Sequence, residues 1–276
     1  MGLNYKDLTI SIVLYNNSVK EITTLLSSLG DVNCQIIIID NSPTNALSIV
    51  VKPYKFVRYI FNNKNLGYGK AHNLAIQISI DSAVKYHLVL NPDIELNSSI
   101  LEELKNYMDN HTDVGLCMPN IVYPNLERQY LCKLLPTPFD LFFRRFTPTK
   151  KMRENHSEKY ELQGVDYTID FESPSLSGCF MFIRTEILER VGVFDKRFFM
   201  YCEDLDLCRR INAYSRTMYV PTAPVIHHYN KQSYRSKKLL LYHLSSTVRY
   251  FNKWGWIFDK KRKEINKKTL KALKID

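Results

Sequence analysis

The sequence predicts an α/β protein with a mostly parallel sheet that is flanked by helices, followed by an amphipathic helical segment at the C-terminus. In the first third of the chain, short β-branched apolar runs alternate with segments whose apolar residues recur at helical spacing. Strands separated by helices in this way form βαβ units, whose strands lie parallel in one sheet. Residues 231–276 differ from the rest because they are strongly basic and carry apolar residues at helical spacing.

Four strands and two helices are predicted in the first third. The runs at 8–14 and 35–39 are too short for buried helices, and the second is apolar throughout, as a strand covered on both faces would be. A helix is predicted over 19–29 because four apolar residues fall on one face, and Gly30 is suited to end it. The other predicted elements are strands at 55–61 and 87–90 and a helix at 71–82.

The second half is less regular. Residues 133–160 hold three prolines and a run of basic residues, so we expect a mobile basic excursion there. The predicted elements are helices at 101–108, 184–191 and 204–213, and strands within 113–121 and 179–183.

Polar residues follow each of the first four predicted strands. Such residues dominate turns, so each group taken alone is explained as a turn. The carboxyl ends of parallel strands meet at one edge of a sheet, however, and ligands of such sheets bind at that edge. Four polar groups that converge there favour a binding site. The groups are Tyr15-Asn16-Asn17, Asp40-Asn41-Ser42, residues 62–70 and Asn91-Pro92-Asp93.

The composition excludes several classes of protein. Its 276 residues are 45% hydrophobic and 24% charged, which are ordinary globular values and argue against disorder, collagen and coiled coil. The net charge of +10 is uneven, because residues 231–276 carry 14 Lys or Arg against three Asp or Glu. The body is therefore close to neutral and the tail is basic.

The location of the protein is predicted from what the sequence lacks. No apolar run approaches the roughly 20 residues that span a bilayer, and the N-terminus does not have the layout of a signal peptide. The six cysteines include no CxxC pair and no zinc-like spacing. We expect a soluble cytoplasmic protein with reduced thiols.

Two motifs carry carboxylates that suggest chemistry. Asn91-Pro92-Asp93 is an oxygen-rich turn that suits Mg²⁺ or Mn²⁺, although an Asp there also suits the cap of the next helix. Glu203, Asp204 and Asp206 place three carboxylates within four residues. The repulsion between these carboxylates must be offset by a bound cation, a nearby arginine or a function that needs them. The alternative is a charged helix start, where carboxylates interact favourably with the helix macrodipole.

Histidines and glycines add weaker signals. His227 or His228 would complete a metal site, although a structural hydrogen bond is the simpler interpretation of either. No GxxxxGK[ST] run is present, which excludes P-loop chemistry. Gly67-Tyr68-Gly69 holds two of the three glycines of a dinucleotide fingerprint, and it follows the third strand instead of the first.

The order of these motifs resembles that of the family 2 glycosyltransferases of GT-A fold. The resemblance extends over roughly residues 8–255, and the block at 199–209 with 225–227 is most similar to bacterial rhamnosyltransferases of surface polysaccharide assembly. It implies a Rossmann-like GT-A domain at 1–230, with a nucleotide-sugar half (1–100) and an acceptor and catalytic half (101–230), and a tail at 231–276. The matching runs are residues 11–16, 39–42, 65–73, 90–93, 177–181, 192–195 and 199–209.

The resemblance also implies roles for single residues. Asp204 matches the catalytic base, with Glu203 beside it. Asp93 and His227 match the residues that hold Mg²⁺ or Mn²⁺, and Asn91 stands where the family's Asp-x-Asp motif has its first Asp. The substrate-binding set is Tyr15, Asn16, Asp40, Asn65, Gly67, Lys70, Asn91, Gly178 and Cys179, with Asp40 at the base or ribose.

The implied reaction is an inverting sugar transfer. An acceptor hydroxyl attacks the anomeric carbon in line with the leaving diphosphate, and no covalent enzyme intermediate is required. The resemblance favours L-rhamnose from dTDP-rhamnose as the donor group and a lipid-linked saccharide as the acceptor. The same reaction with a UDP-hexose or UDP-galactofuranose donor is the alternative.

The basic tail fits such an acceptor. Between residues 237 and 256, apolar residues fall on one helical stripe and the basic residues lie elsewhere. A basic amphipathic helix of this kind lies on an anionic membrane surface, which predicts a peripheral protein on the inner face of the plasma membrane. The alternative is a helix that packs on the body. The stripe is Leu240, Leu244, Val248, Phe251 and Trp254.

Two other classes of function are weighed against this one. A nucleic-acid-binding protein would use the basic tail, but the body is neutral and the carboxylates near residue 204 would repel phosphates, so no nucleic acid is expected as a partner. An oxidoreductase would use the glycine loop at 67–69, which lacks the third glycine.

Overall fold

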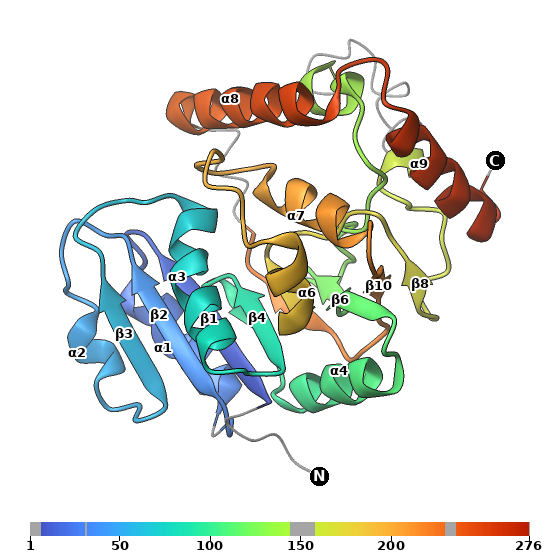
Figure 1. Cartoon of the computed structure of the whole chain (residues 1–276). Coiled ribbons are helices and arrows are strands. Elements are labelled where there is room, and N and C mark those ends of the chain that lie inside the picture. Colours follow the sequence, from blue (N-terminus) through green and yellow to red (C-terminus); the bar gives the residue numbers. More distant parts are fainter. Residues whose placement is uncertain (1–6, 31, 144–157, 230–235, 276) are drawn as a thin grey trace.

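The computed structural model describes residues 7–30, 32–143, 158–229 and 236–275 as one α/β fold around an eight-stranded sheet (Figure 1). The sheet has the order β3-β2-β1-β4-β9-β6-β10-β8. The four strands predicted in the first third are all present and parallel, which confirms the predicted fold class. They are β1 (Leu8–Leu14), β2 (Gln35–Asp40), β3 (Val57–Phe61) and β4 (Tyr86–Leu90).

The second half of the sheet is mixed. The strand β9 (Phe180–Arg184) runs antiparallel to both of its neighbours, β4 and β6 (Val114–Met118). Beyond them, β10 (Arg216–Tyr219) lies parallel to β6, and β8 (Phe171–Glu172) closes the edge antiparallel to β10. The predicted strands at 113–121 and 179–183 are confirmed within a few residues.

A second, three-stranded sheet joins distant parts of the chain. Its order is β5-β11-β7, formed by β5 (Ile94–Glu95), β11 (Val225–His227) and β7 (Ile121–Val122). In the antiparallel pair β5–β11, His227 stands opposite Ile94. This pairing brings the end of the chain's last strand beside the turn that follows β4.

Helices cover both faces of the main sheet. On one face, Val13, Ile37 and Ile39 pack against Ala71 and Ala75 of α3. On the other face, the alternate strand residues join a large core with α1 and α4. The helices are α1 (Val19–Leu29), α2 (Ser48–Val51), α3 (Tyr68–Asp81), α4 (Ser99–Asn110), α6 (Thr185–Val191), α7 (Glu203–Ile211), α8 (Lys237–Trp254) and α9 (Lys260–Ala272).

The prediction of a mobile basic excursion at 133–160 is wrong for the part of this segment that the structure describes. Leu134 and Leu135 are buried, and residues 139–143 form a short π-helix. The Leu135 backbone N–H donates to the Asn266 side chain of α9, which donates in turn to the Leu135 carbonyl, both at 2.9 Å. The chain is held there because its backbone is paired. Residues 144–157 lie outside the described part.

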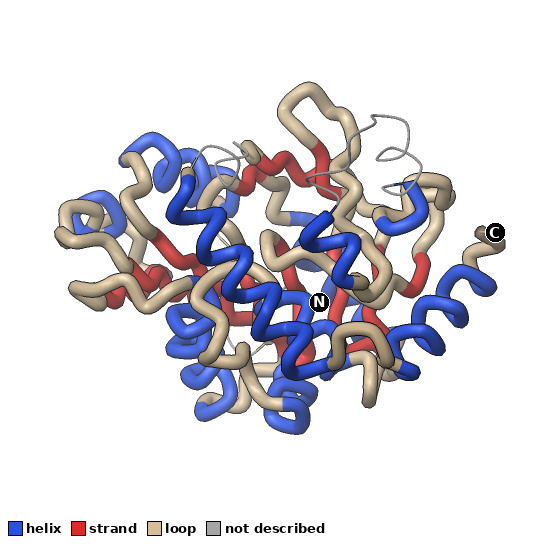
Figure 2. The backbone as a smooth tube through the Cα atoms, turned by 90° about the horizontal axis from the view of Figure 1, so that it is seen from above, coloured by secondary structure: helices blue, strands red, loops and turns tan. Residues whose placement is uncertain are grey.

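The C-terminal helices pack on the body (Figure 2). Seen from above, α8 crosses over the strands and α9 continues to the side. Tyr250 and Phe251 are buried in one cluster with Phe198, Cys202 and Leu205. Residues 236–275 thus share an apolar core with the sheet domain.

The prediction that the apolar stripe of α8 faces a membrane is therefore wrong near the C-terminal end of the helix. Phe251 is fully buried, and the Trp254 indole donates a hydrogen bond of 2.8 Å to Asp206. The buried face includes the small polar residues Ser246 and Thr247, which the apolar spacing did not indicate. The packed alternative is confirmed for this end of the helix. Among the described residues, no helix combines the length and apolar character required to cross a bilayer.

A buried ion pair holds the tail in place. The Arg209 guanidinium of α7 binds both carboxylate oxygens of Asp259 at 2.7 Å, and both side chains are 4% exposed. Asp259 also caps α9 through the backbone N–H of Arg262 at 3.0 Å. Two charges that are buried together depend on each other, since neither can recover water.

Asp259→Ala should lower the free energy of unfolding by about 3–5 kcal/mol, because it leaves the Arg209 charge buried without its partner. Urea unfolding measures the effect. Asp113→Ala is the matched control, since Asp113 pairs with Arg216 at 3.2 Å at the surface. Its loss should be under about 1 kcal/mol. Equal losses in the two variants would contradict a structural role for the buried pair.

Candidate active site

The site forms where the starts of α3 and α7 meet the ends of β4 and β11. The Asn91 backbone N–H donates to the Cys179 carbonyl at 2.9 Å, and the Tyr68 N–H donates to the Phe199 carbonyl at 2.8 Å. The first bond joins the turn after β4 to the segment before β9, and the second joins the glycine loop at 65–69 to the segment before α7. The sheet edge that the sequence predicted is thus the meeting point of four segments.

Gly67 is required by a close approach of two backbones. A Cβ at this position would lie 2.2 Å from the Phe199 carbonyl oxygen, and the residue has a φ of +83°. Only glycine adopts this conformation without strain and leaves room for the neighbouring chain. The loop therefore approaches the segment before α7 closely enough for Tyr68 to bond to it.

Tyr68 connects the polar residues of the site. Its hydroxyl lies 2.6 Å from the Gly178 carbonyl and 3.0 Å from Oδ1 of Asn91. Burial, with the nearby acidic groups of Glu203, Cys179, Asp204 and Asp93, raises the pKa of Tyr68 well above its usual value. The phenol stays neutral and orders the edge through hydrogen bonds.

Asp93 and His227 form the candidate metal site. The β5–β11 pairing sets His227 Nε2 3.3 Å from Asp93 Oδ1, and both atoms are buried without a hydrogen bond of good geometry among the described residues. Burial opposes the charged imidazolium, but Cys179 and Asp93 raise the pKa of His227 to about 10. Two buried polar atoms that face each other in this way are suited to share a cation.

Gln129 orients His227 for this role. His227 Nδ1 lies 2.9 Å from the Gln129 amide oxygen, which only accepts, so Nδ1 carries the proton. The Gln129 amide group donates in turn to the His227 carbonyl at 2.9 Å. Nε2 then faces Asp93, which is the arrangement that metal-binding histidines adopt.

The number of protein ligands is small. Within the described ranges, no three His, Cys, Asp or Glu side chains converge on one point. A hard divalent cation that is held by two side chains keeps positions for phosphate oxygens and water. The residues present fit Mg²⁺ or Mn²⁺ bound together with a diphosphate. His228 faces elsewhere, with Nε2 3.2 Å from Glu95 and nearly half of its side chain exposed.

A buried Glu203 and a half-buried Asp204 form an acid pair at the start of α7. Asp204 Oδ2 accepts from the Gly178 backbone N–H at 3.0 Å, and Oδ1 accepts from the Leu205 N–H at 2.8 Å. Glu203 is 5% exposed, and its Oε2 has no hydrogen bond among the described residues. The negative charge is thus better supported on Asp204 than on Glu203.

Burial sets the protonation of this pair. Burial and the charge of Asp204 raise the pKa of Glu203 to about 8. Burial also raises the pKa of Asp204, but the N–H groups of Gly178 and Leu205 oppose that rise. Tyr201 and Cys202 just before the pair have φ values of +70° and +63°, a strained conformation that is common at functional sites. Both carboxyl groups of the pair thus have raised pKa values, and the backbone N–H groups at Asp204 favour its charged form.

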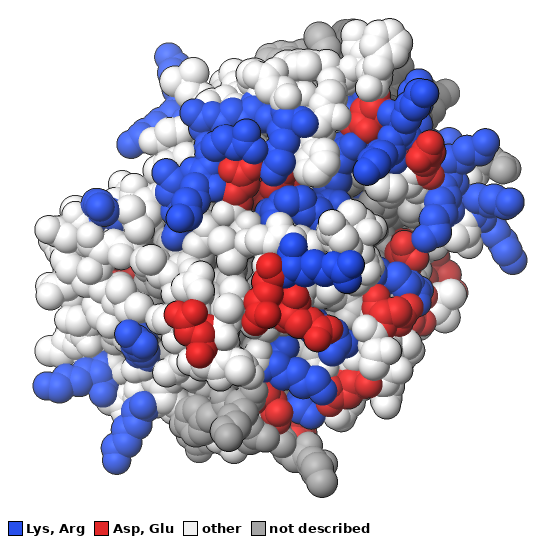
Figure 3. All heavy atoms as spheres, viewed as in Figure 1, with Lys and Arg blue, Asp and Glu red and all other residues white. Residues whose placement is uncertain are grey.

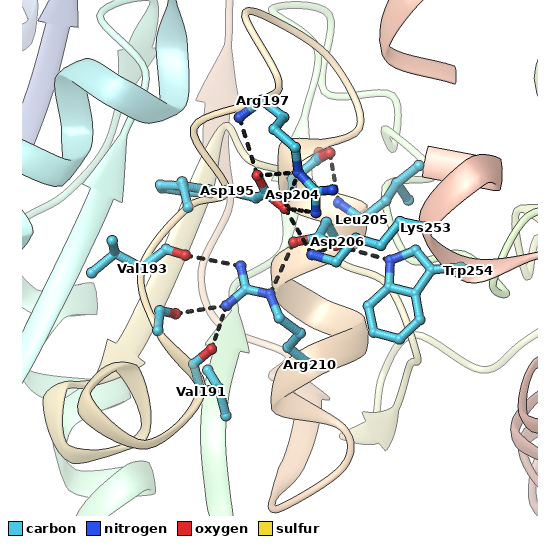
Figure 4. A network of polar contacts seen from close by, with 12 residues as sticks. Val191, Val193, Asp195, Arg197, Asp204, Leu205, Asp206, Arg210, Lys253 and Trp254 are labelled. Carbon is cyan, nitrogen blue, oxygen red and sulfur yellow. Dashed lines mark hydrogen bonds and ion pairs between the residues drawn. The ribbon is translucent and has the colours of Figure 1, made fainter. Parts of the chain in front are cut away.

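Asp206, the third carboxylate of the motif, belongs to the tail interface instead (Figure 4). It binds Lys253 at 2.5 Å, Arg210 at 2.9 Å and the Trp254 indole. Asp206 lies two residues after Asp204 in α7, and its side chain points toward α8 and not toward the site. The charged-helix alternative therefore holds for Asp206.

Asp40 is engaged inside the fold. The side chain is fully buried, with its oxygens accepting from the Ser42 N–H at 2.8 Å and the Tyr59 hydroxyl at 2.5 Å. Contact of Asp40 with a base or ribose stays a prediction, and it requires the Tyr59 hydroxyl to move aside. Asn16 binds the same segment, because its N–H donates to the Ser42 side chain at 2.9 Å.

Three other predicted residues lie at the loops of this edge. Tyr15 is about half exposed after β1. Asn65 accepts from the Gly67 N–H at 2.9 Å and shapes the glycine loop. Lys70 lies apart from Asp93, at a basic hollow of about 610 Å³ that it lines with Lys196, Arg197, Phe199, Arg249, Asn252 and Lys253.

Sequence reasoning missed two residues of the site. Tyr68 stands inside the motif at 65–73, and an aromatic residue between two glycines could have marked it. Gln129 has no such signal, because nothing around it in the sequence predicts that it reaches His227. Its role depends on the position of the loop after β7.

The mostly parallel sheet with its flanking helices is the GT-A fold of glycosyltransferases. Solved structures agree on the fold. GalNAc-T7 with UDP, GalNAc and Mn²⁺ aligns with 91% of this chain at a TM-score of 0.65 and 17% identity, and this chain spans about half (48%) of that one. The mannosyltransferase PcManGT from Pyrobaculum calidifontis, in complex with GDP-Man and Mn²⁺, aligns with 96% of this chain and 74% of its own, at a TM-score of 0.57 and 13% identity.

The sequence profile of glycosyl transferase family 2 matches residues 9–192, so the chain belongs to this family and is a glycosyltransferase. The rhamnosyltransferase WbbL of Escherichia coli K12 is 30% identical over 83% of this chain and 87% of its own length. The N-acetylglucosaminyl-diphospho-decaprenol L-rhamnosyltransferase of Mycobacterium tuberculosis is 27% identical over 70% and 66%. The low-salt glycan biosynthesis hexosyltransferase Agl10 of Haloferax volcanii is 29% identical over 74% and 61%. The resemblance predicted from the motifs is confirmed.

Glu203→Gln should change how stability depends on pH. Between an unfolded pKa of 4.5 and a folded pKa of about 8, the folded chain keeps a proton that the unfolded chain releases. The free energy of unfolding of the parent chain therefore falls by about 1.4 kcal/mol per pH unit across this window, and Gln removes that loss. Relative to the parent, the variant should become more stable from pH 5 to pH 8 in urea unfolding.

The matched control is Glu103→Gln, on the exposed face of α4. Its profile should run parallel to that of the parent chain. A difference between Glu203→Gln and the parent that stays constant over this range would show that Glu203 does not carry the proton.

Proposed function

We propose that this glycosyltransferase transfers L-rhamnose from dTDP-rhamnose, with inversion, to a hydroxyl of a lipid-linked saccharide in the synthesis of a surface polysaccharide such as O-antigen. The observation that carries the reaction is the half-buried Asp204 carboxylate, held by two backbone N–H groups and joined through Gly178 and Tyr68 to the turn that bears Asp93. The donor and the lipid are supported by the relatives, among which WbbL and the mycobacterial enzyme are named rhamnosyltransferases.

Asp204 acts as the general base in this proposal. As the acceptor hydroxyl bonds to the anomeric carbon, its proton passes to the Asp204 carboxylate, and the bond to the diphosphate breaks on the opposite face. The N–H groups of Gly178 and Leu205 keep the carboxylate aimed and ionised. Glu203 remains protonated below about pH 8 and adds no second charge.

Asp93 and His227 would hold Mg²⁺ or Mn²⁺ at the donor diphosphate. The cation supplies charge stabilisation to the leaving group. The chain's own contribution is to keep the two ligands facing each other, through the β5–β11 pairing and through Gln129. Asn91, in place of an Asp, spares the site a further negative charge and bonds to Tyr68.

The donor alternative is a UDP-hexose or UDP-galactofuranose, which the hexosyltransferase of Haloferax volcanii keeps open. The peripheral position on the inner membrane face belongs to this proposal, because a lipid-linked acceptor lies at that surface. Because the chain belongs to a glycosyltransferase family, the oxidoreductase and nucleic-acid-binding functions are not proposed for it.

Asp204→Asn should lower sugar transfer by at least about 100-fold and leave nucleotide binding intact, because only the proton acceptor is lost.

Asp93→Ala should lose the Mn²⁺-dependent rise in melting temperature that dTDP produces, because a ligand raises the melting temperature only of a folded protein that binds it. Radiolabelled sugar transfer and thermal shift measure the two effects. Normal transfer by Asp204→Asn would assign the base elsewhere. A thermal shift with UDP but not dTDP would change the donor.

Gln129→Leu should weaken Mn²⁺ binding in the presence of the nucleotide by about tenfold or more, because His227 Nδ1 loses its acceptor. Electron paramagnetic resonance of Mn²⁺ measures the affinity. His228→Ala is the control and should bind Mn²⁺ as the parent chain does. The opposite result, a loss in His228→Ala alone, would show that His228 is the ligand.

A further inference from the structure

The turn between α8 and α9 presents an apolar tip to solvent. Trp256, Ile257 and Phe258 are 39%, 69% and 93% exposed, and Phe258 is the most exposed of the large apolar side chains in the described residues. Three consecutive apolar residues that project from a turn are unusual on the surface of a soluble domain. We call residues 256–258 the apolar tip.

The apolar tip is held rigidly from below. Gly255 turns the chain out of α8 with a φ of +100°. The guanidinium of Arg262, which is 4% exposed, donates to the carbonyls of Gly255, Trp256 and Ile257 at 3.4, 3.0 and 3.4 Å. The backbone of the tip thus has partners from within the protein. These carbonyls would therefore keep their hydrogen bonds if the tip entered an apolar phase. The usual energetic cost of inserting a loop into such a phase is that of carbonyls left without hydrogen bonds.

Cations surround the apolar tip. Lys260, Lys261 and Lys263 are exposed in the first turn of α9 and make no ion pair within the described part of the chain. Cations are unfavourable at the start of a helix, because the macrodipole is positive there. Asp259, the carboxylate that caps α9, is already bound to Arg209 and Arg262. Within the described ranges this positive charge has no ion-pair partner, which points to an external anion.

The lysines and the tip share a hollow. It has a volume of about 430 Å³ and is lined by Trp254, Phe258, Asp259, Lys260, Lys261 and Lys263. Figure 3 shows Lys and Arg side chains gathered over α9. An apolar projection beside a basic hollow matches the two layers of an anionic bilayer surface, which has acyl chains beneath phosphate headgroups.

We propose that the apolar tip inserts into an anionic phospholipid surface while Lys260, Lys261 and Lys263 bind the headgroup phosphates. This deepens the proposed function, on which it rests, by naming the membrane-binding element. That element is not the stripe of α8, whose end is buried against the body. Lys253 is excluded as well, because Asp195 and Asp206 neutralise it at 2.9 and 2.5 Å. A protein partner is a poorer match, since three side chains fall far below the roughly 20–30 residues of a stable interface.

The apolar arm of the test uses Ile257→Ser with Phe258→Ser, which leaves Trp256 and its contacts in place. Sedimentation with vesicles of 30% phosphatidylglycerol in phosphatidylcholine should show a partition coefficient on the order of 100-fold below that of the parent chain, about tenfold for each side chain withdrawn from the acyl layer. The matched control is Val19→Ser with Ile49→Ser, two exposed residues of α1 and α2. The control should bind as the parent does.

The charge arm replaces Lys260, Lys261 and Lys263 with Gln. Binding to the phosphatidylglycerol vesicles should fall roughly fivefold per lysine, and binding to vesicles of phosphatidylcholine alone should not change. Equal melting temperatures of all variants show that the fold is kept. Lys20→Gln with Lys52→Gln and Lys64→Gln, in the sheet domain, is the matched control.

Three results would overturn the proposal. The first is that the parent chain does not sediment with phosphatidylglycerol vesicles, and the second is that the tip variant sediments as the parent does. The third is that the parent chain forms a dimer without vesicles and the tip variant does not, which would assign the tip to a second copy. Neither measurement contains donor or acceptor, so its failure is distinct from a failure of sugar transfer.

Discussion

The buried charges of α7 are the constraint on which the rest of the structure depends. This one short helix directs Asp204 and Glu203 toward the sheet edge, and Asp206 and Arg209 toward the tail. Charges removed from water need partners, and those partners come from distant segments, Gly178 on one side and α8 and α9 on the other. The helix therefore joins the candidate site and the C-terminal segment into one body.

The same physics explains how the site stays ready for its substrates. Two backbone N–H groups support the charged form of Asp204, whereas burial and the charge of Asp204 raise the pKa of Glu203 and favour its protonated form. Asp93 and His227 remain face to face because two strands and one glutamine fix them. The order is present before any ligand arrives, so less of the binding energy is used to organise the site.

The tail has two parts with different tasks. The α8 face around Tyr250 and Phe251 and the Arg209–Asp259 pair anchor it to the sheet domain. In the turn at 256–258, Trp256 stacks on Phe142, whereas the side chains of Ile257 and Phe258 and the first lysines of α9 are exposed. Asp259 and Arg262 stand between the two parts, since they bind the body on one side and support the exposed turn on the other. An element that docks at a membrane would thereby be rigidly connected to α7 and its acid pair.

The sequence by itself determined the βαβ half of the fold and most of the candidate residues. Strand and helix periodicities are local, and the motifs at 65–73, 90–93 and 203–206 lie at segment ends where ligands of such sheets bind. Tertiary structure alone decided which charges face the candidate site and which serve the packing of the tail, because burial and partners depend on segments far along the chain. Asp204 and Asp206 are two residues apart and chemically alike, yet one meets a backbone N–H and the other meets Lys253 and Arg210. The same reason applies to His227 and His228, to the unforeseen Gln129, and to the buried face of α8.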